Sequence, residues 1–277
     1  MWRESTQPTP WRYRDNACYA ESQKLMPHIL YGDCFAHMRS LPAHSVHAVF
    51  ADLPYGITQN AWDTPIDLQA FWEECWRILP PNGPVICNAA QPFTSALVMS
   101  QVKYFRHEWV WQKTAATGHL NAKHQPMRAH ESIIVFCRKK SPYYPQKTSK
   151  HTPVHSYTKH TSDGKNYGKT KLGIQGGGST DRYPLSVQTF SSDKQKSALH
   201  QTQKPLALMW YLVRTYTTVG QTILDPACGS GTAIVAALLE CRQAIGIESD
   251  PDICRVAQER VVQQQEMLKR AKHDEKE

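Results

Sequence analysis

Several features that define other classes of protein are missing from this sequence. No apolar run approaches the roughly 18 residues that span a bilayer, which excludes a transmembrane helix and a membrane partner. The first 16 residues are polar and lack the apolar core of a signal peptide, so we expect a cytoplasmic protein. The eight cysteines include no CxxC pair, and the histidines show no metal-ligand spacing. We therefore expect no metal site.

Acidic residues are scarce in one long stretch of the chain. Between Arg138 and Arg182 there are ten Lys and Arg residues but only two acids, Asp163 and Asp181, so this stretch supplies the whole excess behind the net charge of +8. Several tyrosines lie among the basic residues. A basic stretch with interleaved aromatic side chains is typical of a nucleic-acid surface, although a solvated, flexible loop is the alternative.

Apolar strands alternate with helices over most of the remaining chain. Short apolar runs with β-branched residues predict strands, and apolar spacing of three and four residues predicts helices. Such an order favours an α/β fold with a mostly parallel sheet that is covered on both faces. The predicted strands are 28–33, 45–52, 84–89, 104–112, 132–138, 221–226 and 243–248, and the predicted helices are 67–79, 93–102, 206–217, 232–240 and one from about 251.

The length of 277 residues suits one large domain with a smaller inserted part. The periodicity disappears at 141–200, where Ser, Thr, Lys, His, Tyr and Gly dominate, so we expect a loop-rich or partly disordered segment there. We divide the chain into an N-terminal extension (1–27), a first half-domain (28–140), the basic segment (141–200), a second half-domain (201–262) and a charged tail (263–277).

A glycine-rich turn follows the strand predicted at 221–226. It runs from Asp225 to Thr232 and reads DPACGSGT. Glycines there permit a tight turn and let the backbone approach a ligand closely. Glu248 ends the next strand, 23 residues (248 − 225) beyond Asp225, which is close to the spacing of about 20 expected for an acid that binds ribose hydroxyls. Because no Lys follows the glycines, this is not a phosphate-binding Walker loop, and we predict a nucleoside ligand without a pyrophosphate.

A second motif, Asp52-Leu53-Pro54-Tyr55, stands at the end of the strand predicted at 45–52. The Asp52 carboxylate and the Leu53 carbonyl can each accept a hydrogen from an exocyclic amino group. Pro54 has no N–H and stiffens the turn, and Tyr55 offers a flat face on which a base can stack. The motif therefore suits a site that holds an amino group by its hydrogens and turns the nitrogen lone pair outward. A simple turn with a proline is the alternative.

Together the two motifs resemble those of the bacterial and phage DNA amino-methyltransferases, which modify N6 of adenine or N4 of cytosine. The acceptor motif of that family is (D/N/S)PP(Y/F/W), and here Leu53 replaces the first proline and would contribute only its backbone carbonyl. The cofactor motif resembles DPFxGSGT, with Ala227 in place of the Phe. The acceptor motif, the basic segment and the cofactor motif follow one another in the circularly permuted order of the β group.

The resemblance implies a Rossmann-like S-adenosylmethionine-dependent methyltransferase fold, with a target-recognition region inserted at 141–200. S-adenosylmethionine is the implied cofactor and double-stranded DNA the implied partner, while a homodimer is left open. The implied reaction flips the target base out of the duplex and proceeds by direct in-line attack of its amino group. An Asp at the head of the acceptor motif favours N6 of adenine, since the N4 enzymes more often begin with Ser.

The same resemblance implies a role for each matching residue. Asp33 would reach the adenine of the cofactor, Glu248 its ribose, and Asp225 its amino-acid end. The implied catalytic residues are Asp52, Leu53, Pro54 and Tyr55. The implied cofactor-binding residues are Asp33, Cys34, Lys204, Pro205, Asp225, Ala227, Cys228, Gly229, Gly231, Thr232, Glu248 and Ser249. The implied DNA-binding residues are Lys139, Lys140, Lys147, Lys150, Lys165, Lys169, Lys171 and Arg182.

Other functions remain open at this point. An N4-cytosine methyltransferase would use the same pocket, and a methyltransferase for RNA or for a protein amide could carry a similar motif. A DNA-binding module that has lost its activity is the alternative from a different class. Methylation at C5 of cytosine is disfavoured because none of the eight cysteines follows a proline.

Overall fold

The structure, a computed structural model, describes residues 27–56, 65–158, 173, 175–192 and 203–274. The chain forms two compact units, one of them Tyr144–Ser186 and the other the remainder. The main elements of the larger unit are β1 (His28–Tyr31), α2 (Cys34–Ser40), β2 (Ala48–Ala51), α3 (Leu68–Ile78), β3 (Val85–Ala89), α4 (Phe93–Ser100), β4 (Phe105–Thr117), β5 (Arg128–Phe136), β8 (Val187–Phe190), α6 (Leu206–Tyr216), β9 (Thr222–Asp225), α7 (Thr232–Leu239), β10 (Gln243–Glu248) and α8 (Pro251–Asp274), with short 3-10 turns at Val102–Tyr104 and His119–Asn121.

The described strands of the larger unit form one eight-stranded sheet in the order β1-β10-β9-β2-β3-β5-β4-β8. The first five strands are parallel to one another. β5 runs antiparallel to both β3 and β4, and β8 is again parallel to β4. Helices connect the parallel strands, as the crossover geometry of parallel sheets requires. The mostly parallel α/β fold predicted from the sequence is confirmed.

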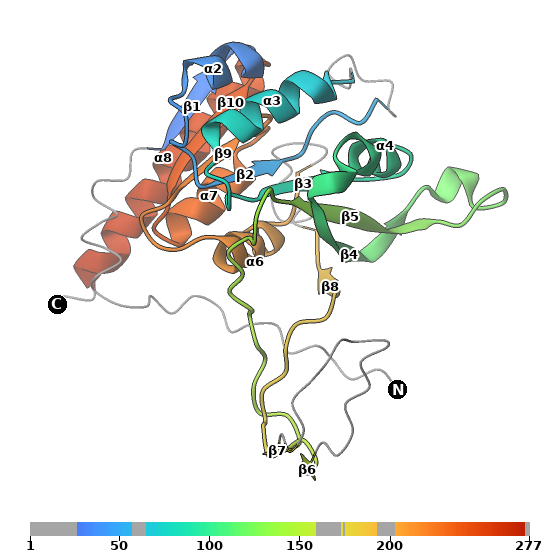
Figure 1. Cartoon of the computed structure of the whole chain (residues 1–277). Coiled ribbons are helices and arrows are strands. Elements are labelled where there is room, and N and C mark those ends of the chain that lie inside the picture. Colours follow the sequence, from blue (N-terminus) through green and yellow to red (C-terminus); the bar gives the residue numbers. More distant parts are fainter. Residues whose placement is uncertain (1–26, 57–64, 159–172, 174, 193–202, 275–277) are drawn as a thin grey trace. The chain divides into compact units, whose positions relative to one another are not determined.

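Successive residues of the central strands point to opposite faces of the sheet. In β2, Ala48 and Phe50 belong to one buried cluster, whereas Val49 and Ala51 belong to another. A strand that is covered on both faces must be apolar throughout, and every residue of β2 and β3 is indeed buried. Helices α6, α7 and α8 cover the first face, and α2, α3 and α4 cover the second (Figure 1).

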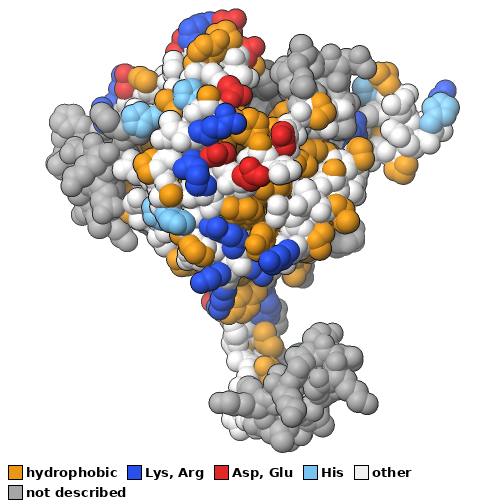
Figure 2. Space-filling model, turned by 45° about the horizontal axis from the view of Figure 1, so that its top comes forward, with side chains coloured by type: hydrophobic (Ala, Val, Ile, Leu, Met, Phe, Trp, Pro, Cys, Tyr) orange, Lys and Arg blue, Asp and Glu red, His pale blue; other side chains and the backbone are white. Residues whose placement is uncertain are grey.

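The outer ends of β4 and β5 extend past the rest of the sheet as a hairpin (Figure 1). The two strands keep their ladder from Phe105 to Gln112, shift register, and meet again at Thr117 and Arg128. Side chains at 119–130 are exposed, and Figure 2 shows the end of this hairpin standing clear of the body. We call residues 114–130 the arm.

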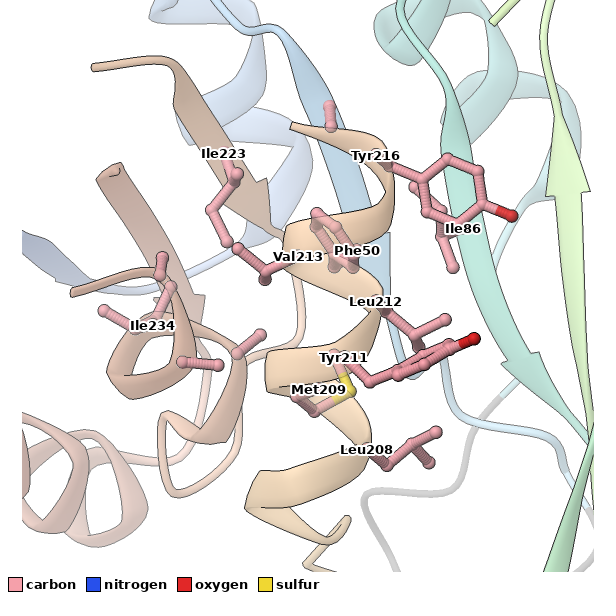
Figure 3. Packing of buried hydrophobic residues seen from close by; sticks show 14 of the residues in the cluster. Phe50, Ile86, Leu208, Met209, Tyr211, Leu212, Val213, Tyr216, Ile223 and Ile234 are labelled. Atoms are coloured by element: carbon pink, nitrogen blue, oxygen red, sulfur yellow. The ribbon is translucent and has the colours of Figure 1, made fainter. Parts of the chain in front are cut away.

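Helix α6 carries much of the core on the first face. Figure 3 shows Leu212 and Tyr216 on the side of Ile86 of β3, and Val213 on the side of Ile223 of β9. Leu212 and Tyr216, one turn apart, are each 1% exposed. The Tyr216 hydroxyl accepts a hydrogen bond of 2.6 Å from the Trp109 indole, so its polar group is satisfied inside the core. Because each buried side chain of this size contributes about 1.5–3 kcal/mol, α6 is a firm anchor for the residues immediately before it.

Two differences from the predicted elements have local causes. Val187–Phe190 forms strand β8, although the sequence analysis placed it in the segment without periodic structure. Its burial alternates weakly because only Phe190 is buried, so a four-residue edge strand leaves little pattern to read. β4 reaches Thr117 rather than 112, since its outer half lies in the exposed arm, where no apolar alternation is needed. The smaller unit therefore ends at Ser186, whereas the predicted segment ran to 200.

The smaller unit contains one short antiparallel pair, β6 (Tyr157–Thr158) with β7 (Gln175–Gly176). A further bridge joins Thr148 to Arg182. Within the described residues, no helix is long and apolar enough to cross a membrane, and no group of His, Cys, Asp or Glu is arranged to hold a metal ion.

Candidate active site

Three acidic side chains lie at the carboxyl ends of neighbouring parallel strands. Asp52 follows β2, Asp225 ends β9 and Glu248 ends β10, and these strands are adjacent in the sheet. The chain leaves β9 through α7 and leaves β2 through α3, and the two helices cover opposite faces. The point between β9 and β2 is therefore a topological switch point, which is where open α/β sheets bind their ligands.

The Asp52 carboxylate is held through both of its oxygens. The Tyr55 hydroxyl donates to Oδ1 at 2.7 Å, and Lys204 Nζ donates to Oδ2 at 2.6 Å. The side chain of Asp52 is still 27% exposed. Because an ionised carboxylate offers about four acceptor positions, these two partners leave room for hydrogens from a substrate.

Packing on the core fixes the other residues of the acceptor motif. Leu53 is 2% exposed and belongs to the cluster on the second face, so its buried side chain anchors the backbone carbonyl beside Asp52. The Tyr55 ring stacks on Phe93 at the start of α4, with centroids 5.2 Å apart and an interplanar angle of 20°. Burial, together with the Asp52 carboxylate, raises the pKa of Tyr55 well above its usual value. The hydroxyl therefore remains a donor at neutral pH.

Lys204 connects the acceptor motif to strands β4 and β5. Its Nζ lies 2.6 Å from Asp52 Oδ2 and 3.4 Å from Glu131 Oε2, and the other oxygen of Glu131 lies 2.6 Å from Lys113 Nζ. Burial opposes the charge on Glu131, but Lys204 and Lys113 outweigh it and lower the pKa of that carboxyl. Burial also opposes the charge on Lys204, but Asp52 and Glu131 outweigh it and raise its pKa. Lys204 and Glu131 are therefore both charged at neutral pH.

This position differs from the role that the sequence analysis gave to Lys204. The predicted role was cofactor binding, whereas the ammonium group is paired with the acceptor carboxylate and with Glu131. Pro205, the other residue of that predicted pair, is buried at the start of α6. It fixes the backbone just after Lys204 because proline restricts φ.

The glycine-rich loop between β9 and α7 is shaped by its backbone. Gly229 and Gly231 have φ of +51° and +78°, in the left-handed region that favours glycine. The N–H of Gly229 donates to Glu248 Oε2 at 2.9 Å, and the N–H of Asp250 donates to the other oxygen, also at 2.9 Å. A Cβ at Gly229 would meet no heavy atom within 4 Å, so open space lies directly against the backbone of the loop.

Asp225 is a buried carboxyl beside this open loop. It is 5% exposed, and its Oδ1 accepts a hydrogen bond of 3.2 Å from the N–H of Ala227. Burial raises its pKa to about 8, and the Asp52 and Glu248 carboxylates act in the same direction. A positively charged ligand bound next to Asp225 would stabilise the ionised form of this carboxyl and lower its pKa.

The turn after β1 closes the other side of the loop. The N–H of Gly32 donates to the Glu248 carbonyl at 2.9 Å, which places Asp33 and Cys34 next to the end of β10. Asp33 is exposed and caps α2 by accepting a hydrogen bond of 2.8 Å from Ala36. Burial raises the pKa of the half-buried Cys34 thiol to about 11, so it is neutral. Ser249 is exposed just beyond Glu248.

Two predicted cofactor residues turn their side chains into the protein. Cys228 is 6% exposed and packs in the first-face cluster. The hydroxyl of Thr232 accepts a hydrogen bond of 2.9 Å from Arg260 of α8, which also donates to the Ser230 carbonyl at 3.0 Å. The Cys228 side chain is therefore turned away from the loop surface, and Arg260 links the hydroxyl of Thr232 and the Ser230 carbonyl to α8.

The predicted DNA-binding residues fall into separate groups. Lys139 and Lys140 are exposed in the larger unit, just after β5. Within the smaller unit, Lys147 and Lys150 are exposed, but Lys147 Nζ lies 4.5 Å from the centroid of the Tyr183 ring. Arg182 donates to backbone carbonyls of Ser179, Asp181 and Thr152, so its guanidinium stabilises its own segment. Lys165, Lys169 and Lys171 lie outside the described residues.

The sequence analysis gave no role to three residues of this site, Lys113, Glu131 and Phe93. Lys113 lies in WQK (111–113) and Glu131 in HESIIVF (130–136), two segments that also resemble the family, but the resemblance implied no role for either residue. Phe93 carried no signal, because its importance comes from its contact with Tyr55, which is distant in the chain.

Comparison with known proteins supplies an independent view of the chain. A family model described as a DNA methylase (N6_N4_Mtase) matches residues 46–259. The DNA adenine methyltransferase YhdJ of Escherichia coli K12 is 26% identical over 253 residues, which cover 84% of this chain and 82% of that protein.

Two solved structures share the fold. The M1.HpyAVI–SAM complex has a TM-score of 0.58 and 20% identity, and covers 85% of this chain and 99% of its own. The cytosine-N4-specific PvuII DNA methyltransferase has a TM-score of 0.58 and 13% identity, and covers 86% of this chain and 90% of its own.

Proposed function

The chain belongs to the N6/N4 DNA methylase family, and from this premise we propose that it methylates N6 of adenine in double-stranded DNA with S-adenosylmethionine as the methyl donor. The observation that carries the proposal is the position of the Asp52 carboxylate, which lies at the switch point beside the glycine-rich loop. The leading Asp of the acceptor motif favours adenine over cytosine, and so does the similarity to a DNA adenine methyltransferase.

The loop after β9 fits this methyl donor. Open space against Gly229 admits a ligand close to the backbone, Glu248 supplies a carboxylate for ribose hydroxyls, and the buried Asp225 suits a ligand ammonium group. Asp33 and Cys34 lie where they can reach an adenine beyond the ribose. When bound, S-adenosylmethionine supplies a methyl group that its positively charged sulfur makes electrophilic.

The acceptor motif then holds the target base, which must leave the duplex to reach it. Asp52 and the Leu53 carbonyl accept the two hydrogens of the exocyclic amino group. The Tyr55 ring, fixed on Phe93 and tied to Asp52, provides a surface for the base. These contacts direct the nitrogen lone pair to the methyl group, so that positioning supplies a large part of the rate.

Charge stabilisation supplies a second part. The amino nitrogen becomes positively charged as its bond to the methyl carbon forms and the bond from that carbon to sulfur breaks. The Asp52 carboxylate lies next to this developing charge and can take the proton that the nitrogen then releases. No side chain needs to form a covalent bond with the base.

Target recognition is the proposed role of the basic segment at 141–200. Its excess of Lys and Arg suits the phosphate backbone, which dominates the affinity of proteins for DNA. Lys139 and Lys140, exposed just after β5 in the larger unit, have the same charge and are also proposed to contact DNA phosphates.

Transfer of a labelled methyl group tests the proposal. The purified protein is incubated with labelled S-adenosylmethionine and plasmid DNA, and the product is digested to nucleosides. We expect the label in N6-methyldeoxyadenosine. Label in N4-methyldeoxycytidine would replace adenine by cytosine as the target. DNA binding without any incorporation would instead favour a DNA-binding module that has lost its activity.

A further inference from the structure

The ammonium group of Lys204 sits in a row of alternating charges. Asp52, Lys204, Glu131 and Lys113 follow one another at N–O distances of 2.6, 3.4 and 2.6 Å. The row has no net charge, and its side chains are between 11% and 27% exposed. Removing one member of such a row leaves the neighbouring charge partly buried and unpaired. The cost in stability is then larger than the net stabilisation that the intact pair provides.

The row reaches Asp52 from one direction only. Tyr55, on the same loop, contacts the other carboxylate oxygen. The remaining titratable groups that act on this carboxylate through space are Asp225 on β9 and Cys87 on β3, with Glu131 one step further away. Lys204 is therefore the one cation among the described groups that contacts the acceptor carboxylate.

We propose that Lys204 is a positioning residue for Asp52, whose carboxylate it holds in the one rotamer that can accept hydrogens from an amino group. This inference rests on the proposed function. It assigns Lys204 to the acceptor side of the reaction, because its ammonium group is already engaged by two carboxylates. Glu131 and Lys113 act behind it by fixing the position of that ammonium group.

Three variants separate this role from a role in binding the cofactor. Lys204→Met keeps the length of the side chain without its charge, Lys204→Arg keeps the charge, and Glu131→Gln weakens the support behind it. Each is measured for cofactor affinity and for the single-turnover rate at saturating cofactor and pH 7.

We expect Lys204→Met to lose about 100-fold or more in single-turnover rate at pH 7. Its cofactor affinity should stay within about threefold of the wild type. Lys204→Arg should restore most of the rate, and Glu131→Gln should lie between the two. A loss of cofactor affinity with a normal rate at saturation would make Lys204 a cofactor ligand and overturn the proposal, as would an unchanged rate.

A double-mutant cycle keeps this test separate from the proposed function. Lys204→Met and Asp52→Asn are combined, and the unfolding equilibrium is measured for all four proteins. We expect a coupling of about tenfold or more in the unfolding constant, because the two residues are in direct contact. If the wild type methylates no DNA, the proposed function fails, and additive effects in the cycle would independently overturn the Lys204 proposal.

The arm carries a second inference, on different observations. No Asp or Glu occurs from 109 to 130, whereas Lys123, Arg128 and three histidines lie in the arm. Leu120 at its tip is 85% exposed. Figure 2 shows basic and histidine side chains, and none in red, at the end of the arm. The arm begins at Lys113 and Glu131, so it starts from the row of charges that ends on Asp52.

We infer that the arm contacts the DNA duplex next to the target base, with Lys123 and Arg128 on phosphates and Leu120 against the bases. Charge complementarity identifies DNA as the partner, because an exposed element that carries positive and no negative charges is attracted to the phosphates of the duplex. The root at the acceptor site brings this contact to the place where the duplex must open.

The salt dependence of DNA binding tests this inference. The double variant Lys123→Glu, Arg128→Glu is compared with Lys269→Glu, Arg270→Glu on α8, which lies at the other side of the sheet (Figure 1). Each lost phosphate contact lowers the slope of log affinity against log salt by about 0.9. We expect the slope to fall in the arm variant by the amount for roughly two phosphate contacts, and to stay unchanged in the α8 variant. Equal slopes in the arm variant and the wild type would overturn the inference.

Discussion

The acceptor region after β2 and the glycine-rich loop after β9 lie side by side on the sheet, but they are built in different ways. The acceptor region is a set of side chains that already satisfy one another: Asp52 is paired with Lys204 and Tyr55, and the Tyr55 ring is stacked on Phe93. The glycine-rich loop is a backbone structure with open space against Gly229 and a buried carboxyl, Asp225, whose pKa is raised.

The acceptor region is therefore suited to position the target base, whereas the glycine-rich loop is completed only when its ligand binds. The acceptor side chains can keep their partners while a base arrives, since Asp52 has acceptor positions to spare. The ionised form of Asp225, in contrast, is stabilised only when a positively charged ligand binds next to it. Substitutions in the first region should therefore act on the chemical step, and substitutions in the second should act on cofactor binding.

The largest effect is expected from Asp52→Ala. It removes both the acceptor for the amino hydrogens and the charge beside the reacting nitrogen, so methyl transfer should fall by roughly 10³-fold or more. Cofactor affinity, measured by calorimetry, should change by less than about threefold. Near-normal turnover in this variant would erase the distinction between the two regions.

A smaller effect, with the opposite signature, is expected from Asp225→Asn. Cofactor affinity should fall by about 30-fold or more, because a charge pair with the ligand is lost. In the wild type, affinity should rise towards pH 8, where Asp225 ionises, and fall again as the α-ammonium group of the ligand loses its charge; Asp225→Asn should lose the rise on the acidic side. Binding isotherms between pH 6.5 and 9.5 provide the measurement, and a flat wild-type profile would contradict the assignment.

The buried Asp225 carboxyl also makes the stability of the ligand-free protein depend on pH. Because burial raises its pKa, its contribution to stability is present at low pH and is lost as the pH rises through about 8. Ligand-free Asp225→Asn should therefore unfold at a higher temperature than the wild type at pH 9, with the gap narrowing towards acidic pH. Thermal melts without cofactor test the sign.

The smallest effect is expected from Gly229→Ala, with Gly118→Ala in the arm as its matched control. Both glycines have positive φ and open space where a Cβ would stand, so each substitution should cost about 1–2 kcal/mol of stability. Only the methyl group at 229 would lie in the space reserved for the cofactor. We expect KM for the cofactor to rise about tenfold in that variant alone, and equal cofactor kinetics in the two variants would show that the space is not used.

The two regions also differ in how far the sequence could predict them. Asp52, Asp225 and Glu248 each stand where an apolar run stops, so their place at one edge of the sheet follows from local pattern. The pairing of Lys204 with Asp52 joins residues that are 152 apart in the chain, and no local pattern contains it. The role that the sequence analysis gave to Lys204, cofactor binding, came from the resemblance to the family, which says nothing of this pairing.

Elements were predicted best where the spacing of apolar residues is regular or a turn marks the boundary. The strand at 243–248 has the predicted bounds, and the helix from 251 begins where it was expected. Strand β8 escaped notice because three of its four residues are not buried. The outer half of β4 was missed because the arm packs on nothing that would demand apolar alternation.

Mass spectrometry of nucleosides tests the central claim most directly. DNA from cells that express the wild type is compared with DNA from cells that express Asp52→Ala, in a host that lacks other DNA methylation. The account predicts N6-methyldeoxyadenosine with the wild type and none with the variant. N4-methyldeoxycytidine in its place, or N6-methyldeoxyadenosine that persists with Asp52→Ala, would contradict it.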